Sequence, residues 1–401
     1  MDGVTEGSDQ KTTAIVVPPQ APATNADVRP RVMLLGSGGL SRELAIALGR
    51  LGAWVIAVDK YASAPAHAVA DESIVIPMSD ANELAEVIRR LRPDYVVTAA
   101  DEVSAQALEG VGPTGPQLVP SARAVRLTAD REGLRRLAAD ELGLPTAPFW
   151  FAGSVGELQA VGAHAGYPLL VKPVAGATPR GESVIAGPDD IEPVWQRVAG
   201  AQQRVLAETV VEVEFYVTLL AVRSEGPDGP AIEFCSPIGH RGVNADVQES
   251  WQPQKISASA MDAARSIAAR IVKALGGRGV FGVELMINGD EVYFADVTPH
   301  LPASAWVTAR SQRLSAFELQ ARTVLGLPVD TMMVSPGAAR GVDPVNAPTA
   351  AALNGALSVP ESDLRSCGRG FTALATAPEV TAARDRAGSV AGRLTASDSR
   401  G

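Results

Sequence analysis

Short apolar runs alternate with amphipathic stretches through the first third of the chain. Their spacing predicts, in order, a strand at Val32–Leu35, a turn at Gly36–Gly38, a helix at Arg42–Leu51, a strand at Trp54–Val58, a helix at Ala81–Leu91 and a strand at Tyr95–Thr98. Strands that alternate with helices in this way are typical of a doubly wound α/β domain with a parallel sheet. We therefore predict such a domain over residues 31–125.

The pattern changes after this domain. Leu127–Glu141 has the spacing of an amphipathic helix, and short apolar strands are predicted at Tyr167–Val174 and Arg204–Val211. Residues Gly279–Pro299 alternate in strand fashion on both sides of N-G-D, which indicates a hairpin because these residue types tolerate positive φ. The Gly-, Ala- and Pro-rich segment Ser335–Leu374 predicts a small β-rich region.

These patterns divide the chain into four segments. The first thirty residues lack the charged-then-apolar pattern of a secretion signal and are rich in Thr, Pro and Ala, so we expect a disordered extension. The predicted division is the extension at 1–30, the α/β domain at 31–125, a central α+β domain at 126–330 and a small C-terminal domain at 331–401.

Composition restricts the possible partners. The chain of 401 residues has 46% hydrophobic and 20% charged residues, which is ordinary for a globular protein. A net charge of −10 argues against nucleic acid as a partner, because a phosphate backbone would be repelled. No apolar run approaches the length of a membrane span. Two cysteines, Cys235 and Cys367, lie far apart without metal-binding spacing, so we expect a reducing, cytoplasmic location.

The predicted hairpin carries two carboxylates. Folding back at Asn288 and Gly289 places Glu284 and Asp296 opposite each other on paired strands. Two carboxylates held together require a cation, and Mg²⁺ suits such a pair because it completes its shell with phosphate oxygens and water. Two solvated acids on an edge hairpin are the alternative interpretation.

One lysine stands inside an apolar strand. Lys172 follows Y-P-L-L-V, and a lysine on a buried strand is costly unless it meets an anion. The next apolar strand carries Glu208 at a position where main-chain groups of a nucleotide-binding enzyme meet an adenine edge.

The lysine strand, the Glu208 strand and the carboxylate hairpin, in this order, resemble the ATP-grasp family, whose members clamp ATP between two α+β subdomains and form acyl phosphates. After residue 30 the chain resembles one branch, the formate-dependent phosphoribosylglycinamide formyltransferases. The segments that carry this resemblance are Arg31–Gly38, Val55–Asp59, Tyr61–His67, Leu127–Ala139, Glu249–Gln254, Gly279–Leu285 and Ala373–Ala377. The resemblance implies an ATP-grasp fold, ATP and Mg²⁺ as cofactors, formate and glycinamide ribonucleotide as substrates, formyl phosphate as intermediate, and a homodimer.

The resemblance also assigns residues to the nucleotide site. Arg131 and Lys172 are expected to act in catalysis by contacting the ATP phosphates. The remaining expected contacts are Glu208, Val211 and Glu214 for the nucleotide, and Glu284 and Asp296 for the metal.

Two departures from the family pattern concern the same site. Pro179 removes an N–H from the expected phosphate loop, Ala175–Glu182, and Tyr216 stands where the family has a ribose-binding glutamate. We therefore expect ATP binding to be weakened.

The acceptor site departs further. The resemblance assigns substrate contacts to Leu40 and Arg369. Three family acids are replaced, by Gly39, Ala99 and Ala303, and the family's arginine after the hairpin is His300. Because each lost polar contact weakens recognition, we expect slow or absent formylation, which restoring the three acids together would raise.

Other interpretations remain open. The glycines of Gly36–Glu43, with Asp59 after the second strand, also suit a dinucleotide fingerprint, although a lone glycine-rich turn is weak evidence. Trp251 either lines an acyl site or belongs to the core, and His240 either faces phosphate or lies in an ordinary loop. An ATP-grasp ligase with another acceptor and a non-catalytic nucleotide-binding paralogue are the alternative functions.

Overall fold

The computed structural model describes residues 29–174, 182–199, 204–226, 229–242, 248–344, 347–368 and 370–396. The predicted extension lies outside this range up to residue 28. Within the described part, no helix combines the length and apolar character needed to cross a membrane.

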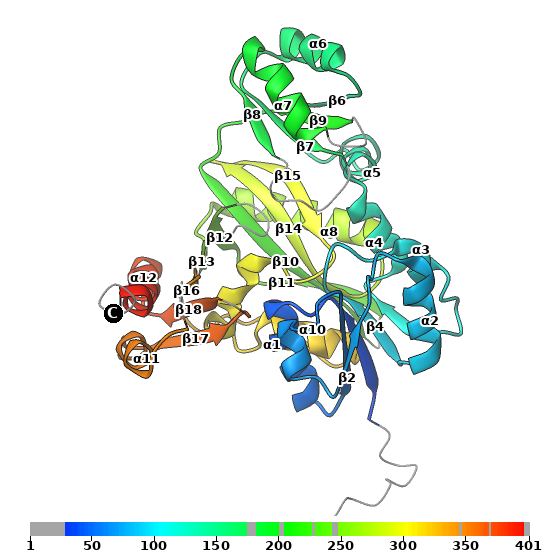
Figure 1. Ribbon diagram of the computed structural model, residues 1–401. Coiled ribbons are helices and arrows are strands. Elements are labelled where there is room, and N and C mark those ends of the chain that lie inside the picture. Colours follow the sequence, from blue (N-terminus) through cyan, green and yellow to red (C-terminus); the bar gives the residue numbers. More distant parts are fainter. Residues whose placement is uncertain are drawn as a thin grey trace, which may run out of the picture.

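The N-terminal domain is the predicted doubly wound α/β unit (Figure 1). Its elements are β1 (Arg31–Leu35), α1 (Gly39–Arg50), β2 (Trp54–Asp59), β3 (Glu72–Val75), α2 (Ala81–Leu91), β4 (Tyr95–Thr98), α3 (Ala105–Glu109) and β5 (Gln117–Val119). Among the described residues they form a parallel sheet in the order β3-β2-β1-β4-β5. The carboxyl ends of β1 and β4 lie side by side, which is where open α/β sheets form binding crevices.

The predicted helix at Leu127–Glu141 is wrong as a single element. The structure has α4 (Ala122–Ala129), α5 (Arg131–Arg136) and a π-helical segment (Leu137–Glu141). The break falls at Asp130, which has extended backbone and accepts a hydrogen bond from the Gly133 N–H at 3.0 Å. Asp favours this N-cap position because its carboxylate satisfies a free helix N–H. The break places Arg131 on the first turn of a new helix.

A small sheet forms the upper part of Figure 1. Its elements are β6 (Phe149–Ala152), α6 (Val155–Ala165), β7 (Leu169–Pro173), β8 (Ser183–Ile185), α7 (Ile191–Val198) and β9 (Val205–Thr209). The strands are antiparallel in the order β6-β9-β7-β8, and α6 and α7 pack against them through a buried aliphatic cluster. The two strands predicted here from their apolar runs are β7 and β9.

A second, larger antiparallel sheet occupies the centre of the molecule. Its first part comprises β10 (Phe215–Gly226), β11 (Gly229–Phe234), β12 (Ile238–Arg241), β13 (Glu249–Gln252), β14 (Gly279–Asn288) and β15 (Glu291–Thr298). The sheet continues into the C-terminal segment, because β13 pairs with β16 (Gly337–Val342), followed by β18 (Phe371–Thr376) and β17 (Ser362–Ser366). The C-terminal segment also contains α11 (Ala350–Leu357) and α12 (Val380–Ala396). The β-rich region therefore extends the central sheet.

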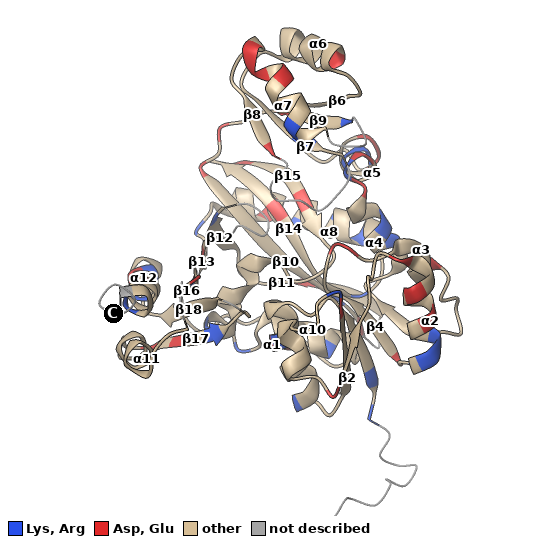
Figure 2. Ribbon diagram, viewed as in Figure 1, with Lys and Arg blue, Asp and Glu red and all other residues tan. Residues whose placement is uncertain are grey.

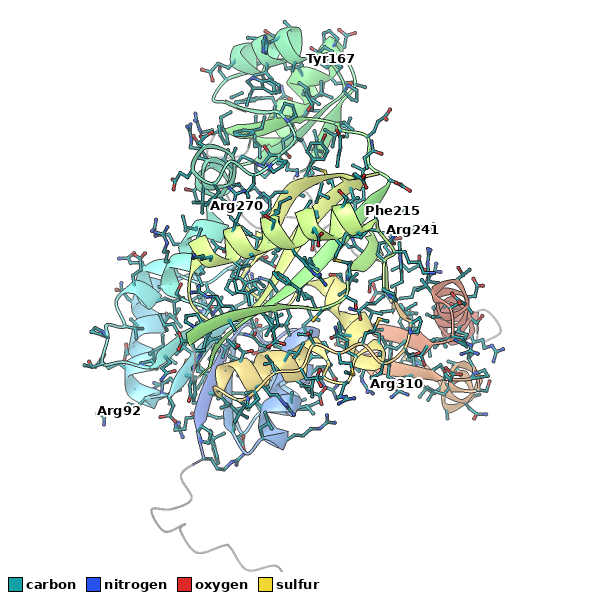
Figure 3. All side chains as sticks on the ribbon, turned by 180° about the vertical axis from the view of Figure 1, so that it is seen from behind. Arg92, Tyr167, Phe215, Arg241, Arg270 and Arg310 are labelled. Atoms are coloured by element: carbon teal, nitrogen blue, oxygen red, sulfur yellow. The ribbon has the colours of Figure 1, made fainter. Side chains whose placement is uncertain are left out.

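The two faces of this sheet serve different purposes. Alternate residues of β14, including Val283 and Leu285, are buried with α8 (Ala258–Leu275), which crosses the back of the sheet in Figure 3. On the opposite face, Leu220 of β10 and Val280 of β14 belong to a core that also contains residues of α1 and α10 (Ala316–Val324). Because this core is shared, the N-terminal domain is fixed against the strands that carry the predicted metal ligands.

Candidate active site

The carboxylate hairpin forms as predicted. Glu284 of β14 and Asp296 of β15 are direct cross-strand partners. The loop consists of Gly289 and Asp290, one residue later than predicted, and Gly289 has a φ of 58°. An irregularity between Glu284 and Leu285 shifts the register of the two strands. Figure 2 shows the acidic positions of both strands in red.

Glu284 is held by neighbours from two other strands. Its Oε1 accepts a hydrogen bond from Thr218 Oγ1 of β10 at 2.8 Å, and its Oε2 lies 2.9 Å from His240 Nε2 of β12. Burial alone would lower the pKa of His240, but the bond to Glu284 raises it above its usual value. Thr218 also contacts Ser304 Oγ at 2.7 Å. His240 thus orients the predicted metal ligand, a role that differs from both sequence interpretations, a phosphate contact and an ordinary loop residue.

Asp296 has a different environment. Its Oδ1 accepts a hydrogen bond from the Val297 N–H at 2.8 Å. Burial raises the pKa of Asp296, against the opposing effect of Lys172 and the arginines nearby. A carboxylate with a raised pKa gains from a further cation close by.

The donor set fits Mg²⁺. The described residues contain no group of three or more His, Cys, Asp or Glu arranged as metal ligands, so Glu284 and Asp296 stand as a pair. Mg²⁺ tolerates one or two protein carboxylates because phosphate oxygens and water fill its remaining positions.

A second charged cluster joins the small sheet to α5. Lys172 Nζ lies 3.1 Å from Glu208 Oε2, and the other oxygen of Glu208 contacts Arg135 at 2.5 Å. Burial alone would lower the pKa of Lys172, but nearby carboxylates, Glu208 foremost, raise it. Arg135 also donates to the carbonyls of Phe294 and Ala295 on β15. Lys172 on β7 therefore meets an anion from the neighbouring strand β9, as its burial requires.

Arg131 completes this side of the site. Its guanidinium donates to the Pro173 carbonyl at 2.8 Å. Arg131, Lys172 and Asp296 all line one small hollow between α5, β7 and β15. The structure thus brings together both predicted catalytic residues and one predicted metal ligand.

The other predicted nucleotide contacts are more dispersed. The side chain of Glu208 points into the charged cluster, and Val211 is half-buried in the segment after β9. Glu214 is exposed and accepts a hydrogen bond from Gly289 at the hairpin tip at 3.3 Å. The half-exposed Tyr216 ring lies 6.5 Å from that of His240, on the strand that carries Thr218.

A cavity of about 480 Å³ adjoins the hairpin. It is bounded by Leu40 of α1, the segment after β4, α4 and the segment after β15. Arg131, Glu284 and Asp296 line this cavity, and so do Leu40 and Ala303. The cavity therefore connects the predicted nucleotide residues to the predicted acceptor residues.

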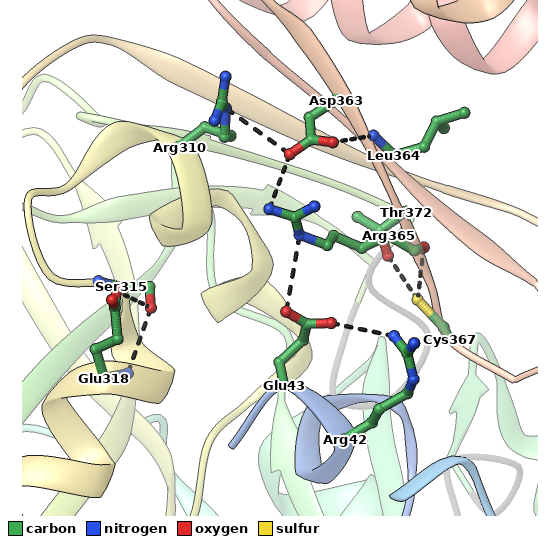
Figure 4. A network of polar contacts seen from close by, with 10 residues as sticks. All are labelled: Arg42, Glu43, Arg310, Ser315, Glu318, Asp363, Leu364, Arg365, Cys367 and Thr372. Atoms are coloured by element: carbon green, nitrogen blue, oxygen red, sulfur yellow. Dashed lines mark hydrogen bonds and ion pairs between the residues drawn. The ribbon is translucent and has the colours of Figure 1, made fainter. Parts of the chain in front are cut away.

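Gly39 has no space for the glutamate that the resemblance places there. A Cβ on Gly39 would lie 2.9 Å from Cys367 Cα and 3.0 Å from Cys367 Cβ. Figure 4 shows what holds this contact: Arg365, two residues before Cys367, pairs with Glu43 of α1 at 3.7 Å and with Asp363 at 2.9 Å. Restoring the three acids together therefore requires Cys367 to shift away from position 39. Arg369 and Pro179 lie outside the described residues.

The segment Glu249–Gln254 has a packing role. Glu249 accepts two hydrogen bonds from Arg384 of α12, whose guanidinium lies 4.0 Å from the centre of the Trp251 ring. The Trp251 N–H donates to Gln254 at 2.7 Å. The partly buried Trp251 ring also packs against a buried alanine cluster, which supports the core interpretation.

The sequence did not indicate that Asp101 and His300 form a pair in the cavity. His300 Nε2 lies 2.8 Å from Asp101 Oδ1, and both side chains line the cavity. Asp101 stands three residues after β4, which is the sequence signal that marks a crevice position in an α/β domain.

Comparison with known proteins agrees with this architecture. Residues 30–129 match the ribonucleotide synthetase preATP-grasp domain, and residues 137–317 match the ATP-grasp domain. A carboxyaminoimidazole ribonucleotide synthase from Aspergillus clavatus, 22% identical, superimposes with a TM-score of 0.79 over 91% of this chain and 99% of that chain. The fold and site thus define an ATP-grasp protein with a pre-ATP-grasp domain.

Relatives of higher sequence identity identify the branch of the ATP-grasp family. A formate-dependent phosphoribosylglycinamide formyltransferase of Corynebacterium glutamicum is 46% identical over 89% of this chain and 92% of the relative. The solved structure of glycinamide-RNase-transformylase T from Mycobacterium tuberculosis is 65% identical, with a TM-score of 0.81 over 91% of this chain and 99% of that one. The chain belongs to the formate-dependent phosphoribosylglycinamide formyltransferase family.

Proposed function

We propose that this chain transfers a formyl group from formate to glycinamide ribonucleotide at the expense of ATP. The observation that carries the proposal is one cavity lined both by Arg131, Glu284 and Asp296 and by Leu40 and Ala303, in a chain whose relatives bear this activity in their names. A formate oxygen attacks the γ-phosphorus, ADP leaves, and formyl phosphate forms. The primary amine of the acceptor then attacks the formyl carbon, loses a proton and displaces phosphate.

The roles of the charged residues follow from electrostatics. Lys172 and Arg131 would stabilise negative charge on the transferring phosphoryl group, because preorganised cations lower the barrier where charge develops. Glu284 and Asp296 would hold Mg²⁺, which supplies further charge neutralisation at the phosphates. Glu208, Val211 and Glu214 would contact the nucleotide, and Leu40 and Arg369 the acceptor.

The assembly and location are further parts of the proposal. The family resemblance supports a homodimer, and light scattering that reports only monomer at micromolar concentration would contradict it. Two cysteines without a disulfide among the described residues support a cytoplasmic location.

Leaving out one or both substrates in turn tests the proposed function. ADP release is measured with ATP and Mg²⁺ alone, with formate added, with glycinamide ribonucleotide added, and with both. We expect full release only with both substrates, together with formylated product detected by mass. Release with formate and a different amine would instead indicate another ligase, and nucleotide binding without any release would indicate a non-catalytic paralogue.

A further inference from the structure

One polar pair crosses the cavity between the two domains. Asp101 follows β4 of the N-terminal domain, and His300 follows β15 of the central sheet, 199 residues later. The Asp101 side chain is 54% exposed and that of His300 is 14% exposed. The pair therefore fixes Asp101 at the cavity surface without burying it.

His300 is held through both ring nitrogens. Nε2 contacts Asp101 Oδ1 at 2.8 Å, and Nδ1 lies 3.3 Å from the Leu301 carbonyl. Burial alone would lower the pKa of His300, but the bond to Asp101 raises it, as expected for an imidazolium paired with a carboxylate. With both nitrogens engaged, His300 orients Asp101 and has no nitrogen left for a substrate.

The other carboxylates of the cavity have partners of their own. Glu284 is bonded to Thr218 and His240, and Asp296 accepts from the Val297 N–H and lies opposite Glu284 in the predicted metal pair. Glu102 pairs with Lys60. Asp101 accepts from His300 through Oδ1, and a carboxylate has further lone pairs on its second oxygen. This leaves Asp101 with acceptor capacity toward the cavity.

We propose that Asp101, oriented by His300, accepts a hydrogen bond from the primary amine of the acceptor substrate. This inference rests on the proposed function and names a further acceptor-binding residue of the same site. Asp101 stands two residues after Ala99, where the resemblance expects an acid, so it supplies a carboxylate that Ala99 does not. Asp101 also lines the cavity together with Leu40, the predicted substrate residue, and Ala303.

The test compares two neighbouring isosteric variants. Asp101→Asn retains the size of the side chain and a carbonyl oxygen for His300 but loses the charge. Glu102→Gln is the matched control, because Glu102 lines the same cavity but pairs with Lys60. We expect Asp101→Asn to raise KM for glycinamide ribonucleotide at least about tenfold, since a charge-assisted hydrogen bond is lost. The KM values for ATP and formate should stay within about twofold in both variants.

A third variant separates orientation from folding. His300→Arg restores the family's residue and can still donate to Asp101, so its KM for the acceptor should stay close to that of the unmodified chain, whereas His300→Ala should raise it. Unchanged acceptor KM in Asp101→Asn would overturn the inference, as would equal increases for all three substrates.

Binding measurements distinguish failure of the inference from failure of the proposed function. If the unmodified chain does not formylate, the proposed function fails. Calorimetry with glycinamide ribonucleotide and a non-hydrolysable ATP analogue then decides the inference alone. Weaker acceptor binding by Asp101→Asn than by Glu102→Gln supports it. Equal binding by the two variants, or no binding by the unmodified chain, overturns it.

Discussion

The two sides of the cavity are built differently. The nucleotide side, together with the adjoining hollow lined by Lys172 and Arg135, is dense in paired charges: Lys172 and Arg135 share Glu208, and His240 and Thr218 hold Glu284. The acceptor side presents Leu40 and Ala303, and its main charged feature among the described residues is Asp101 with His300. The residues proposed to handle ATP are thus supported by several strands, whereas the proposed recognition of the acceptor depends on fewer polar groups.

This difference predicts how each side responds to substitution. Removing a charged group from a network leaves its former partner buried and unpaired, so the substitution affects both activity and folding. A substitution at an apolar position that has no polar partner affects activity only by changing the contacts with the substrate. We therefore expect slow formylation, limited by the acceptor side and dependent on Asp101.

The largest effect is expected for Lys172→Met. Removing this ammonium should lower kcat/KM for ATP by about 100-fold or more, because a preorganised cation at the phosphates is lost. It should also destabilise the fold by about 1–3 kcal/mol, since the buried Glu208 loses one of the cations that pair with it. Steady-state kinetics and urea unfolding measure the two effects. Lys273→Met, at an exposed position of α8, is the control and should change neither.

The next effect concerns the metal pair. Glu284→Gln should weaken Mg·ATP binding about tenfold or more, because the amide is a poorer Mg²⁺ ligand than the carboxylate. The fold should persist, since Gln retains groups that can bond to Thr218 and His240. Calorimetry with and without Mg²⁺ measures this change, and an unaltered Mg²⁺-dependent affinity would remove the metal assignment.

On the acceptor side, Gly39→Glu should destabilise the protein by about 1–3 kcal/mol because its Cβ meets the Cys367 backbone. Gly38→Ala is the matched control, since nothing lies within 4 Å of its added Cβ. Its free energy of unfolding should be close to that of the unmodified chain. Ala99→Glu with Ala303→Asp tests restoration without the clash, and we expect this double variant to formylate faster. Increased activity in Gly39→Glu alone would show that the contact with Cys367 yields readily.

The smallest effect is expected for Glu132 of α5, which pairs with Arg204 at 2.7 Å. The hydrogen bond from Arg204 lowers the pKa of Glu132 from 4.5 to about 2. A lowered folded-state pKa contributes stability that is complete above the unfolded value and is lost as pH falls through the folded value. The stability difference between the unmodified chain and Glu132→Gln should therefore shrink between about pH 4.5 and 2. Urea unfolding across this range measures it, and a difference independent of pH would contradict the pairing.

Local patterns were enough to predict the features that lie within one segment. The hairpin of Glu284 and Asp296 follows from alternation around N-G-D, and the Lys172 strand follows from its apolar neighbours. The break at Asp130 was missed although D-R-E-G carries an N-cap signal, because the apolar spacing runs through it.

Contacts between distant segments could not be predicted in this way. His240 with Glu284, Asp101 with His300, and Gly39 with Cys367 each join residues from different elements. Periodicity assigns a residue to a face of its own strand or helix, but only the packing of several elements decides what that face meets. The steric block at Gly39 is invisible in sequence for this reason.

Isotope transfer tests the central claim most directly, namely that this site activates formate as an acyl phosphate. Formate labelled with ¹⁸O in both oxygens is supplied with ATP, Mg²⁺ and glycinamide ribonucleotide, and the released phosphate is analysed by mass. Because a formate oxygen attacks the γ-phosphorus and stays with it when the amine displaces phosphate, we predict one ¹⁸O atom in each phosphate released. Phosphate without ¹⁸O, in which water has supplied the fourth oxygen to the three from ATP, would contradict the account.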